Sequence, residues 1–170
     1  QAASVSLNWK SPAEAKTMQW HNDTPYNGVS GVSLNGEIPV LYIANRFDKD
    51  DLKEYKGSVI DAISFCNYSA VLEVSLLLYE NDKVVREQKV NLENLKLKEM
   101  QTIKLDEPYT VRDDVELTVA AKFVHGTNLT FVGIMDRVPG VTGKGDLYSY
   151  DGKNWKNVVK GNFLVSAHID

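Results

Sequence analysis

The residues best suited to nucleophilic catalysis are the single cysteine, Cys66, and three histidines, His21, His125 and His168. A thiol hydrolase needs a thiolate that a neighbouring histidine favours, and a third polar group that orients the histidine. Cys66 instead ends the apolar run 59–66, which predicts a strand rather than the turn before a helix that lowers a thiol pKa. We therefore expect Cys66 to be a buried core residue and chemically inert.

Acidic side chains offer a second route to hydrolysis, because a glycosidase uses two carboxylates that flank the scissile bond. The chain holds 23 aspartates and glutamates, so some pair will lie at a suitable separation by chance. No pair has an apolar neighbourhood that would raise one pKa. The sequence predicts no catalytic residue, and a hydrolase that uses Cys66 or a carboxylate pair stays an alternative.

Asp48, Asp50 and Asp51 are a candidate calcium site, because they bring several oxygen ligands into one short stretch. The same carboxylates suit the start of a helix, where they interact favourably with its macrodipole. Helix capping is the interpretation we prefer. The histidines lack the short spacing of zinc ligands, and we expect no metal and no cofactor.

Aromatic side chains form the candidate recognition surface, since sugar rings and peptide side chains stack on exposed Trp and Tyr faces. Tyr148 and Tyr150 would share one face of a strand, with Trp155 on the return strand of the hairpin. Leu147 would point the other way, toward the core. Trp20 is a second candidate. The alternative is that these rings only cover an edge of the core.

Charge and hydropathy restrict the partners of the chain. A formal net charge of −4 lacks the excess of Lys and Arg that nucleic acid binding needs. No apolar run approaches the roughly 20 residues that span a bilayer, so no membrane span is predicted. The start Gln1–Ala2–Ala3–Ser4 has the form of a mature end left by a signal peptide or lipoprotein leader. It predicts an extracytoplasmic protein and leaves room for a lipid anchor.

The elements that position these residues are strands, because apolar and polar residues alternate with period two. Three segments show inward apolar faces: Leu72, Val74, Leu76 and Leu78; Leu117, Val119, Ala121 and Phe123; and Phe163, Val165, Ala167 and Ile169. Thr118 is expected to face outward. Further strands are expected over residues 5–9, 39–47, 58–66, 83–90, 101–105, 129–135 and 146–150. Their spacing, with turns such as Asn81–Asp82, predicts an all-β, two-sheet antiparallel β-sandwich.

One short helix is expected over residues 48–57, where a carboxylate-rich start precedes a stop at Gly57. No repeat, low-complexity tract or linker divides the chain, so residues 1–170 are interpreted as a single domain. Residues 1–35 form its irregular N-terminal portion.

A set of packing and turn residues runs from Trp20 to Ile169, nearly the whole chain. Its members are Trp20, the strand 39–47, Asp50, Leu52, Tyr55, Gly57, Ile60, Ile63, Phe65, Glu107–Pro108–Tyr109, the strand after Glu116, Gly145–Asp146–Leu147, Asp151–Gly152 and Trp155. The set resembles a β-sandwich module of secreted Bacteroidetes-type proteins, found beside gingipain-related cysteine peptidases and adhesins. The resemblance implies a jelly-roll-like sandwich, a secreted, cell-surface or outer-membrane location, and an accessory or adhesive role.

Together these observations predict a non-catalytic extracytoplasmic domain of a bacterial surface or secreted protein that binds an extracellular glycan or protein. The alternatives are the hydrolase described above and a structural spacer or assembly protein of the cell envelope. A clustered aromatic surface would favour binding over spacing.

Overall fold

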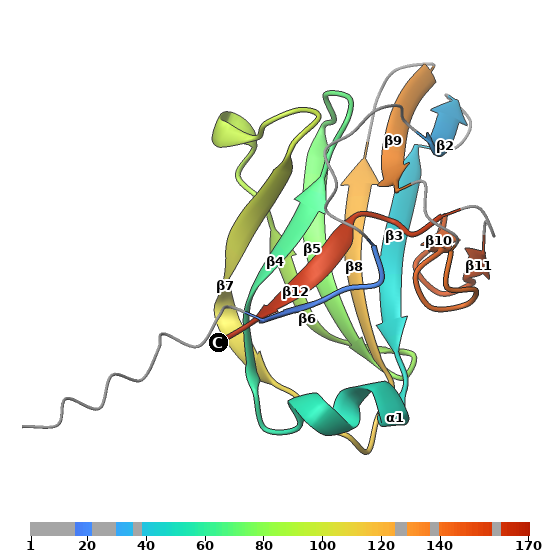
Figure 1. Ribbon diagram of the computed structural model, residues 1–170. Helices are drawn as coiled ribbons and strands as arrows, with labels where there is room; N and C mark the ends of the chain where they lie inside the picture. The colour runs from blue at the N-terminus through green and yellow to red at the C-terminus, as the bar shows by residue number, and fades with distance from the viewer. Residues whose placement is uncertain (1–15, 22–29, 36–38, 125–128, 137–139, 158–160) are drawn as a thin grey trace, which may run out of the picture.

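The structure, a computed structural model, describes residues 16–21, 30–35, 39–124, 129–136, 140–157 and 161–170 (Figure 1). Almost all of its elements are strands. No helix in these ranges is long and apolar enough to cross a membrane. The strand expected over residues 5–9 lies outside the described residues.

The strands form two large antiparallel sheets and a separate ribbon (Figure 1). The four-stranded sheet has the order β1 (Lys16–Met18), β12 (Val165–Ile169), β4 (Val59–Cys66) and β7 (Met100–Thr110). The six-stranded sheet has the order β11 (Lys156–Asn157), β10 (Leu147–Ser149), β3 (Val40–Phe47), β8 (Leu117–Val124), β5 (Glu73–Glu80) and β6 (Lys83–Lys89). The ribbon pairs β2 (Ser30–Asn35) with β9 (Leu129–Met135).

Eight of these strands have the connectivity of a jelly roll. They form the two sheet orders β1-β12-β4-β7 and β3-β8-β5-β6. Along the chain these eight strands alternate between the two sheets, except that the β5–β6 hairpin stays within one sheet. Two sheets of four strands connected in this way are the double-sheet arrangement of jelly rolls. The predicted all-β sandwich is confirmed.

The main core lies between the two sheets, and alternate residues of each strand fill it. Two predicted inward faces are buried throughout: Leu117, Val119, Ala121 and Phe123 of β8, and Phe163, Val165, Ala167 and Ile169 at the end of the chain. Each large apolar side chain buried in this way contributes about 1.5–3 kcal/mol. Both face predictions are confirmed.

The third predicted face, on β5, is correct in its centre and wrong at its start. Val74, Leu76 and Leu78 are buried between the sheets. Leu72 is 63% exposed, because it precedes Glu73, the first residue of β5, and belongs to the connection from β4.

A second apolar cluster covers the outer face of the six-stranded sheet. Its buried members are Ala44, Leu77, Tyr79, Ala120 and Leu147, with Tyr42 and Trp155 packed against them. Ala44 and Ala120 are cross-strand partners, and their small side chains leave room for larger rings. The expectation that Thr118 faces water is wrong, since this residue is buried and its hydroxyl accepts a hydrogen bond from Arg46.

A short helix connects β3 to β4 at one end of the sandwich (Figure 1). Asp48 caps α1 (Lys49–Leu52): the carboxylates of Asp48 and Asp51 each accept the other residue's backbone amide at 2.9 Å. The chain continues as the 3₁₀ turn η1 (Lys53–Tyr55) and turns at Gly57, whose φ of +80° favours glycine. The predicted helix is confirmed, with a shorter α-helical part.

Three strands differ from the sequence prediction. β1 and β2 lie within residues 1–35, so the expectation of an irregular portion is wrong for these two segments. β7 continues through Glu107–Pro108–Tyr109, which the sequence presents as a turn. The proline is tolerated there because residues 105–108 lie in a break of the β4–β7 register, on a strand at the edge of its sheet. The connection from β6 to β7 includes the 3₁₀ turn η2 (Leu92–Asn94).

Candidate functional site

Cys66 is a buried residue at the end of β4. Its side chain is 2% exposed, and burial raises the pKa of the thiol to about 11. At neutral pH the thiol is protonated and therefore a poor nucleophile. The predicted burial is confirmed. His21 is also buried, and His125 lies outside the described residues.

His168 contacts a serine rather than the cysteine. Its Nε2 hydrogen bonds to the Ser64 hydroxyl, which also contacts the Thr102 hydroxyl at 2.6 Å. A histidine that activates a serine needs an orienting acid, and within the described ranges no carboxylate hydrogen bonds to His168. Ser64 is also 4% exposed, in the middle of β4. His168, Ser64 and Thr102 therefore form a line of contacts across three strands and lack the acid of a catalytic triad.

The acidic residues considered for calcium have separate partners. Lys144 Nζ lies 3.0 Å from Asp48 Oδ2 and 2.8 Å from Asp51 Oδ2. The Asp51 amide and the Lys144 ammonium lower the pKa of Asp48 to about 2. Asp50 instead pairs with Lys53 at 2.7 Å. No group of three or more His, Cys, Asp or Glu within the described part of the chain could hold a metal ion, and the capping interpretation is confirmed.

Trp20 is fixed at the edge of the main core. Its ring stacks on Phe47 with centroids 5.4 Å apart, and its Nε1 donates to the Arg46 carbonyl at 2.8 Å. Its amide donates to the buried Asn45 side chain, which in turn donates to the Phe163 carbonyl. Asn45 thereby ties three segments together, although its position in a strand gives no sequence signal of that role. These contacts support the edge-of-core interpretation of Trp20.

The predicted aromatic surface is divided between the two faces of the six-stranded sheet. Tyr148 and Tyr150 pack against the main core, and the Tyr148 ring lies 6.4 Å from that of Phe163. Leu147 points the other way, as predicted, but it joins the second cluster on the outer face. Trp155 packs on that outer face as well. The expectation of one surface formed by all three rings is therefore wrong.

A tight turn after β10 brings Trp155 back over the sheet. The Asp151 carboxylate accepts the amides of Asn154 and Lys153 at 2.8 Å each, and it also accepts the Ser149 hydroxyl at 2.9 Å. These hydrogen bonds hold the pKa of Asp151 well below its usual range. The turn is thus locked by its own side chains.

Gly152 allows this turn to lie close to the sheet. Its φ is +73°, and a Cβ at this position would come within 2.8 Å of the Tyr42 ring. Trp155 then packs edge-on against Tyr42 and Tyr79, at centroid distances of 6.3 and 5.7 Å. The tryptophan serves to cover the second cluster.

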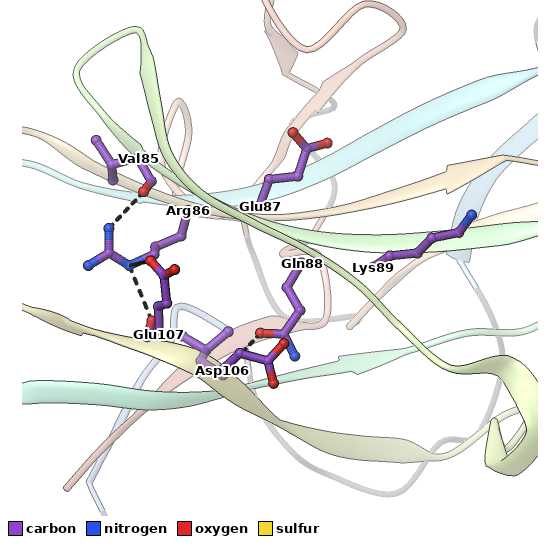
Figure 2. A pocket seen from close by; sticks show the side chains of 8 residues that line it. Val85, Arg86, Glu87, Gln88, Lys89, Asp106 and Glu107 are labelled. Carbon is purple, nitrogen blue, oxygen red and sulfur yellow. Dashed lines mark hydrogen bonds and ion pairs between the residues drawn. The ribbon is translucent and has the colours of Figure 1, made fainter.

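An open groove runs along the side of the sandwich where the edge strands β6 and β7 face each other (Figure 2). It consists of two hollows of about 420 and 520 Å³ that share Val85 and Arg86. Figure 2 shows Arg86 and Gln88 reaching from β6 toward β7, whereas Glu87 points to the other side of β6.

Side chains bridge the two edge strands. The Gln88 side-chain nitrogen donates to the Lys104 backbone carbonyl at 2.9 Å, and the Gln88 side-chain oxygen accepts from the Asp106 backbone amide at 2.8 Å. Gln88 thus takes the place that a neighbouring strand would have. The Arg86 guanidinium donates to the carbonyls of Glu107 and Pro108, each at 3.2 Å. The outer backbone edge of β7 is therefore occupied from Lys104 to Pro108 without a further strand.

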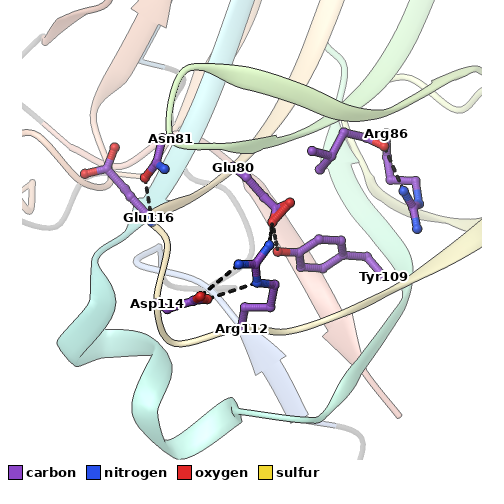
Figure 3. A network of polar contacts seen from close by, with 8 residues as sticks. Glu80, Asn81, Arg86, Tyr109, Arg112, Asp114 and Glu116 are labelled. Atoms are coloured by element: carbon purple, nitrogen blue, oxygen red, sulfur yellow. Dashed lines mark hydrogen bonds and ion pairs between the residues drawn. The ribbon is translucent and has the colours of Figure 1, made fainter.

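A polar network closes one end of the groove (Figure 3). Arg112 donates two hydrogen bonds to Asp114, at 2.9 and 2.8 Å, and a third to Glu80 at 3.1 Å. Tyr109 donates to the same Glu80 oxygen at 3.4 Å. Burial, together with the Glu80 charge, raises the pKa of Tyr109 to about 12. The phenol is therefore a permanent donor at neutral pH.

The tip of the β5–β6 hairpin is fixed beside this network. Asn81 has a φ of +52°, its amide donates to the Glu116 carbonyl at 2.8 Å, and its Oδ1 accepts the Glu116 amide at 3.1 Å (Figure 3). The predicted turn at Asn81–Asp82 is confirmed. These contacts hold one wall of the groove in place.

The groove also carries charged groups that have no protein partner among the described residues. Within the part of the chain that the structure describes, the Lys83 ammonium and the Asp106 carboxylate make no hydrogen bond or ion pair. Val84, which lines the larger hollow, is 40% exposed. The groove thus combines fixed walls with polar groups that are free to contact a ligand.

The sequence does contain a signal for this groove. Residues 83–89 place charged or amide side chains on both faces of one strand, a pattern typical of an edge strand. The opposing wall could not be found in the same way, because Glu107–Pro108–Tyr109 has the composition of a turn.

Comparison with known proteins gives no relative for this chain: no family model, no curated protein and no solved structure matches it.

Proposed function

We propose that this chain is a non-catalytic binding or adhesion domain that acts outside the cytoplasm and recognises an extracellular ligand in the groove between β6 and β7. The observation that carries the proposal is the presence of two polar groups, Lys83 and Asp106, that have no partner among the described residues and lie on walls that other side chains hold in place. A pre-formed concave surface with a few convergent polar groups is the usual form of a ligand site. The sequence resemblance supports the extracytoplasmic location.

The properties of the reactive residues favour binding over hydrolysis. The Cys66 thiol is buried and protonated at neutral pH, and the Ser64–His168 pair has no orienting carboxylate among the described residues. A spacer would need only a closed surface. A groove with free charged groups is therefore the feature that favours recognition.

The proposal is tested by titrating the ¹⁵N-labelled protein with neutral oligosaccharides, sulfated oligosaccharides and extracellular-matrix peptides. Backbone amide shifts locate the bound surface, and mass spectrometry of the recovered ligand detects cleavage. We expect shifts at residues 83–89 and 104–112, with every ligand recovered intact. Binding that maps elsewhere would contradict the proposed site, and cleavage lost in Cys66→Ala or Ser64→Ala would contradict a non-catalytic role.

A further inference from the structure

We infer that the larger hollow of the groove binds an anionic group, a carboxylate or sulfate, carried by an acidic glycan. The inference rests on the proposed function, because it names the ligand class of the same groove. Three cationic side chains line this hollow, Lys83, Arg86 and Arg112, and the single carboxylate that lines it is that of Glu80. The side chains that line the hollow thus carry a formal charge of +2 in a chain whose formal net charge is −4, and Glu107 and Asp114 beside it pair with the two arginines.

Two of the three carboxylates that pair with the arginines are exposed and can yield to a ligand, whereas Glu80, the second partner of Arg112, is 19% exposed. Glu107 is 81% exposed and its carboxylate lies 3.9 Å from Arg86 Nε, and Asp114 is 63% exposed. Exposed ion pairs of this kind contribute about 0–1 kcal/mol, so a ligand anion can share or replace them at little cost. Lys83 has no counter-ion within the described part of the chain.

Tyr109 gives the hollow a neutral wall, and its hydroxyl hydrogen is already donated to Glu80. Tyr109 forms part of the lining, and its phenol stays protonated at neutral pH, so that it adds no negative charge. The Arg86 guanidinium lies over the Tyr109 ring at 5.9 Å. A planar guanidinium held in this way presents a fork of N–H donors that suits a carboxylate or sulfate.

The edge of β7 argues for a glycan rather than an acidic peptide. One common way for a peptide to bind a sandwich is to add a strand to a free sheet edge. Gln88 and Arg86 already occupy the outward groups of Lys104, Asp106, Glu107 and Pro108. A ligand must therefore bind through side-chain contacts, which a polyhydroxylated chain with an acidic substituent can make.

The test compares Lys83→Gln with Lys153→Gln. Both variants remove one exposed lysine and change the net charge equally, but Lys153 lies in the turn after β10, away from the groove. Binding of a heparin hexasaccharide and of trigalacturonic acid is measured by amide shifts at low salt. We expect Lys83→Gln to weaken binding about five- to tenfold and Lys153→Gln to leave it unchanged.

A second pair of variants tests the sign of the charge within the hollow. Val84→Glu adds a carboxylate at the exposed rim, and Val84→Gln adds a neutral side chain of the same size. We expect the first variant to abolish binding and the second to retain it, with equal melting temperatures.

Cellohexaose, inorganic sulfate and an oligoglutamate peptide separate the remaining sources of binding. Shifts in the groove caused by cellohexaose or the peptide, without shifts from either acidic glycan, would overturn the inference and leave the proposed function standing. Binding of inorganic sulfate alone, or equal loss in both lysine variants, would also overturn it. A groove that no probe shifts would overturn the inference and the proposed site together.

Discussion

The outer face of the six-stranded sheet and the groove between β6 and β7 are two surfaces of one sandwich. Apolar packing covers the first, and hydrogen bonds satisfy the second. On the outer face, Trp155 and Tyr42 cover small and apolar residues, and the result is a second core. In the groove, Arg86 and Gln88 occupy the backbone edge of β7 with hydrogen bonds, and the result is an open, polar surface.

The difference separates residues that serve stability from residues that can serve recognition. Trp155 is partly buried and packs edge-on against Tyr42 and Tyr79, so this ring contributes to the fold. Among the residues that the structure describes, Lys83 has no partner to lose when a ligand binds. The comparison therefore predicts that substitutions on the covered face change stability, whereas substitutions in the groove change binding.

The largest expected effect is that of a charge in the main core. Leu76 is 1% exposed and Val84 is 40% exposed, on the paired strands β5 and β6. Leu76→Asp would bury an unpaired carboxylate at a cost of several kcal/mol, on the order of the whole stability of a domain. Val84→Asp is the matched control and should change stability by less than about 0.5 kcal/mol. Equal melting temperatures for the two variants would show that the wrong face of β5 has been placed inside.

Removing the cover of the outer face should have the next largest effect. Trp155→Ala exposes the cluster around Leu77 and Tyr79 and should cost about 3 kcal/mol in chemical denaturation. Trp155→Phe keeps an aromatic ring there and should cost about 1 kcal/mol. Ligand binding in the groove should be unchanged in Trp155→Phe. A stable Trp155→Ala variant that has lost binding would reverse the assignment of the two regions.

Alkaline pH should lower the free energy of unfolding through ionisation of the Cys66 thiol. Its pKa is about 11 in the folded protein and near 9 when exposed, so above pH 9 the unfolded state loses the thiol proton first. The contribution of Cys66 to stability is therefore complete below pH 9. It falls by about 2 kcal/mol as the pH rises toward 11. Cys66→Ala should show a correspondingly smaller loss between pH 8 and 11 in urea denaturation. Parallel curves for both proteins would mean that the thiol is not buried as described.

Freeing the β7 edge should have the smallest effect on stability. Gln88→Leu removes both hydrogen bonds to β7 and should cost about 1 kcal/mol. Hydrogen exchange of the Asp106 amide should accelerate in this variant, because its acceptor is gone. Gln88→Glu keeps that acceptor and should retain much of the protection. Unchanged exchange in Gln88→Leu would show that the bridge does not protect the edge.

The sequence predicts the inward strand faces well, because alternation is a local property of each strand. Leu117, Val119, Ala121 and Phe123 need only the period of two to be placed inside. The Asn81–Asp82 turn and the helix cap at Asp48 are local in the same sense.

The covered outer face could not be predicted, because it depends on a contact between distant segments. Gly152 and Trp155 contact Tyr42 and Tyr79 because β10 pairs with β3, which lies far away in the sequence. Tyr148 lies on the inner face of the sheet and packs against the main core. No local sequence pattern distinguishes the inner face of β10 from the outer one. The groove is long-range for the same reason, with one wall from residues 83–89 and the other from 104–112.

A crystal structure of the protein soaked with a heparin hexasaccharide tests the division between the two regions most directly. We predict that an acidic group of the hexasaccharide lies within hydrogen-bonding distance of Lys83 and Arg86, with Trp155 free of ligand. Hexasaccharide stacked on Trp155 or Tyr150, with the groove between β6 and β7 empty, would contradict the account.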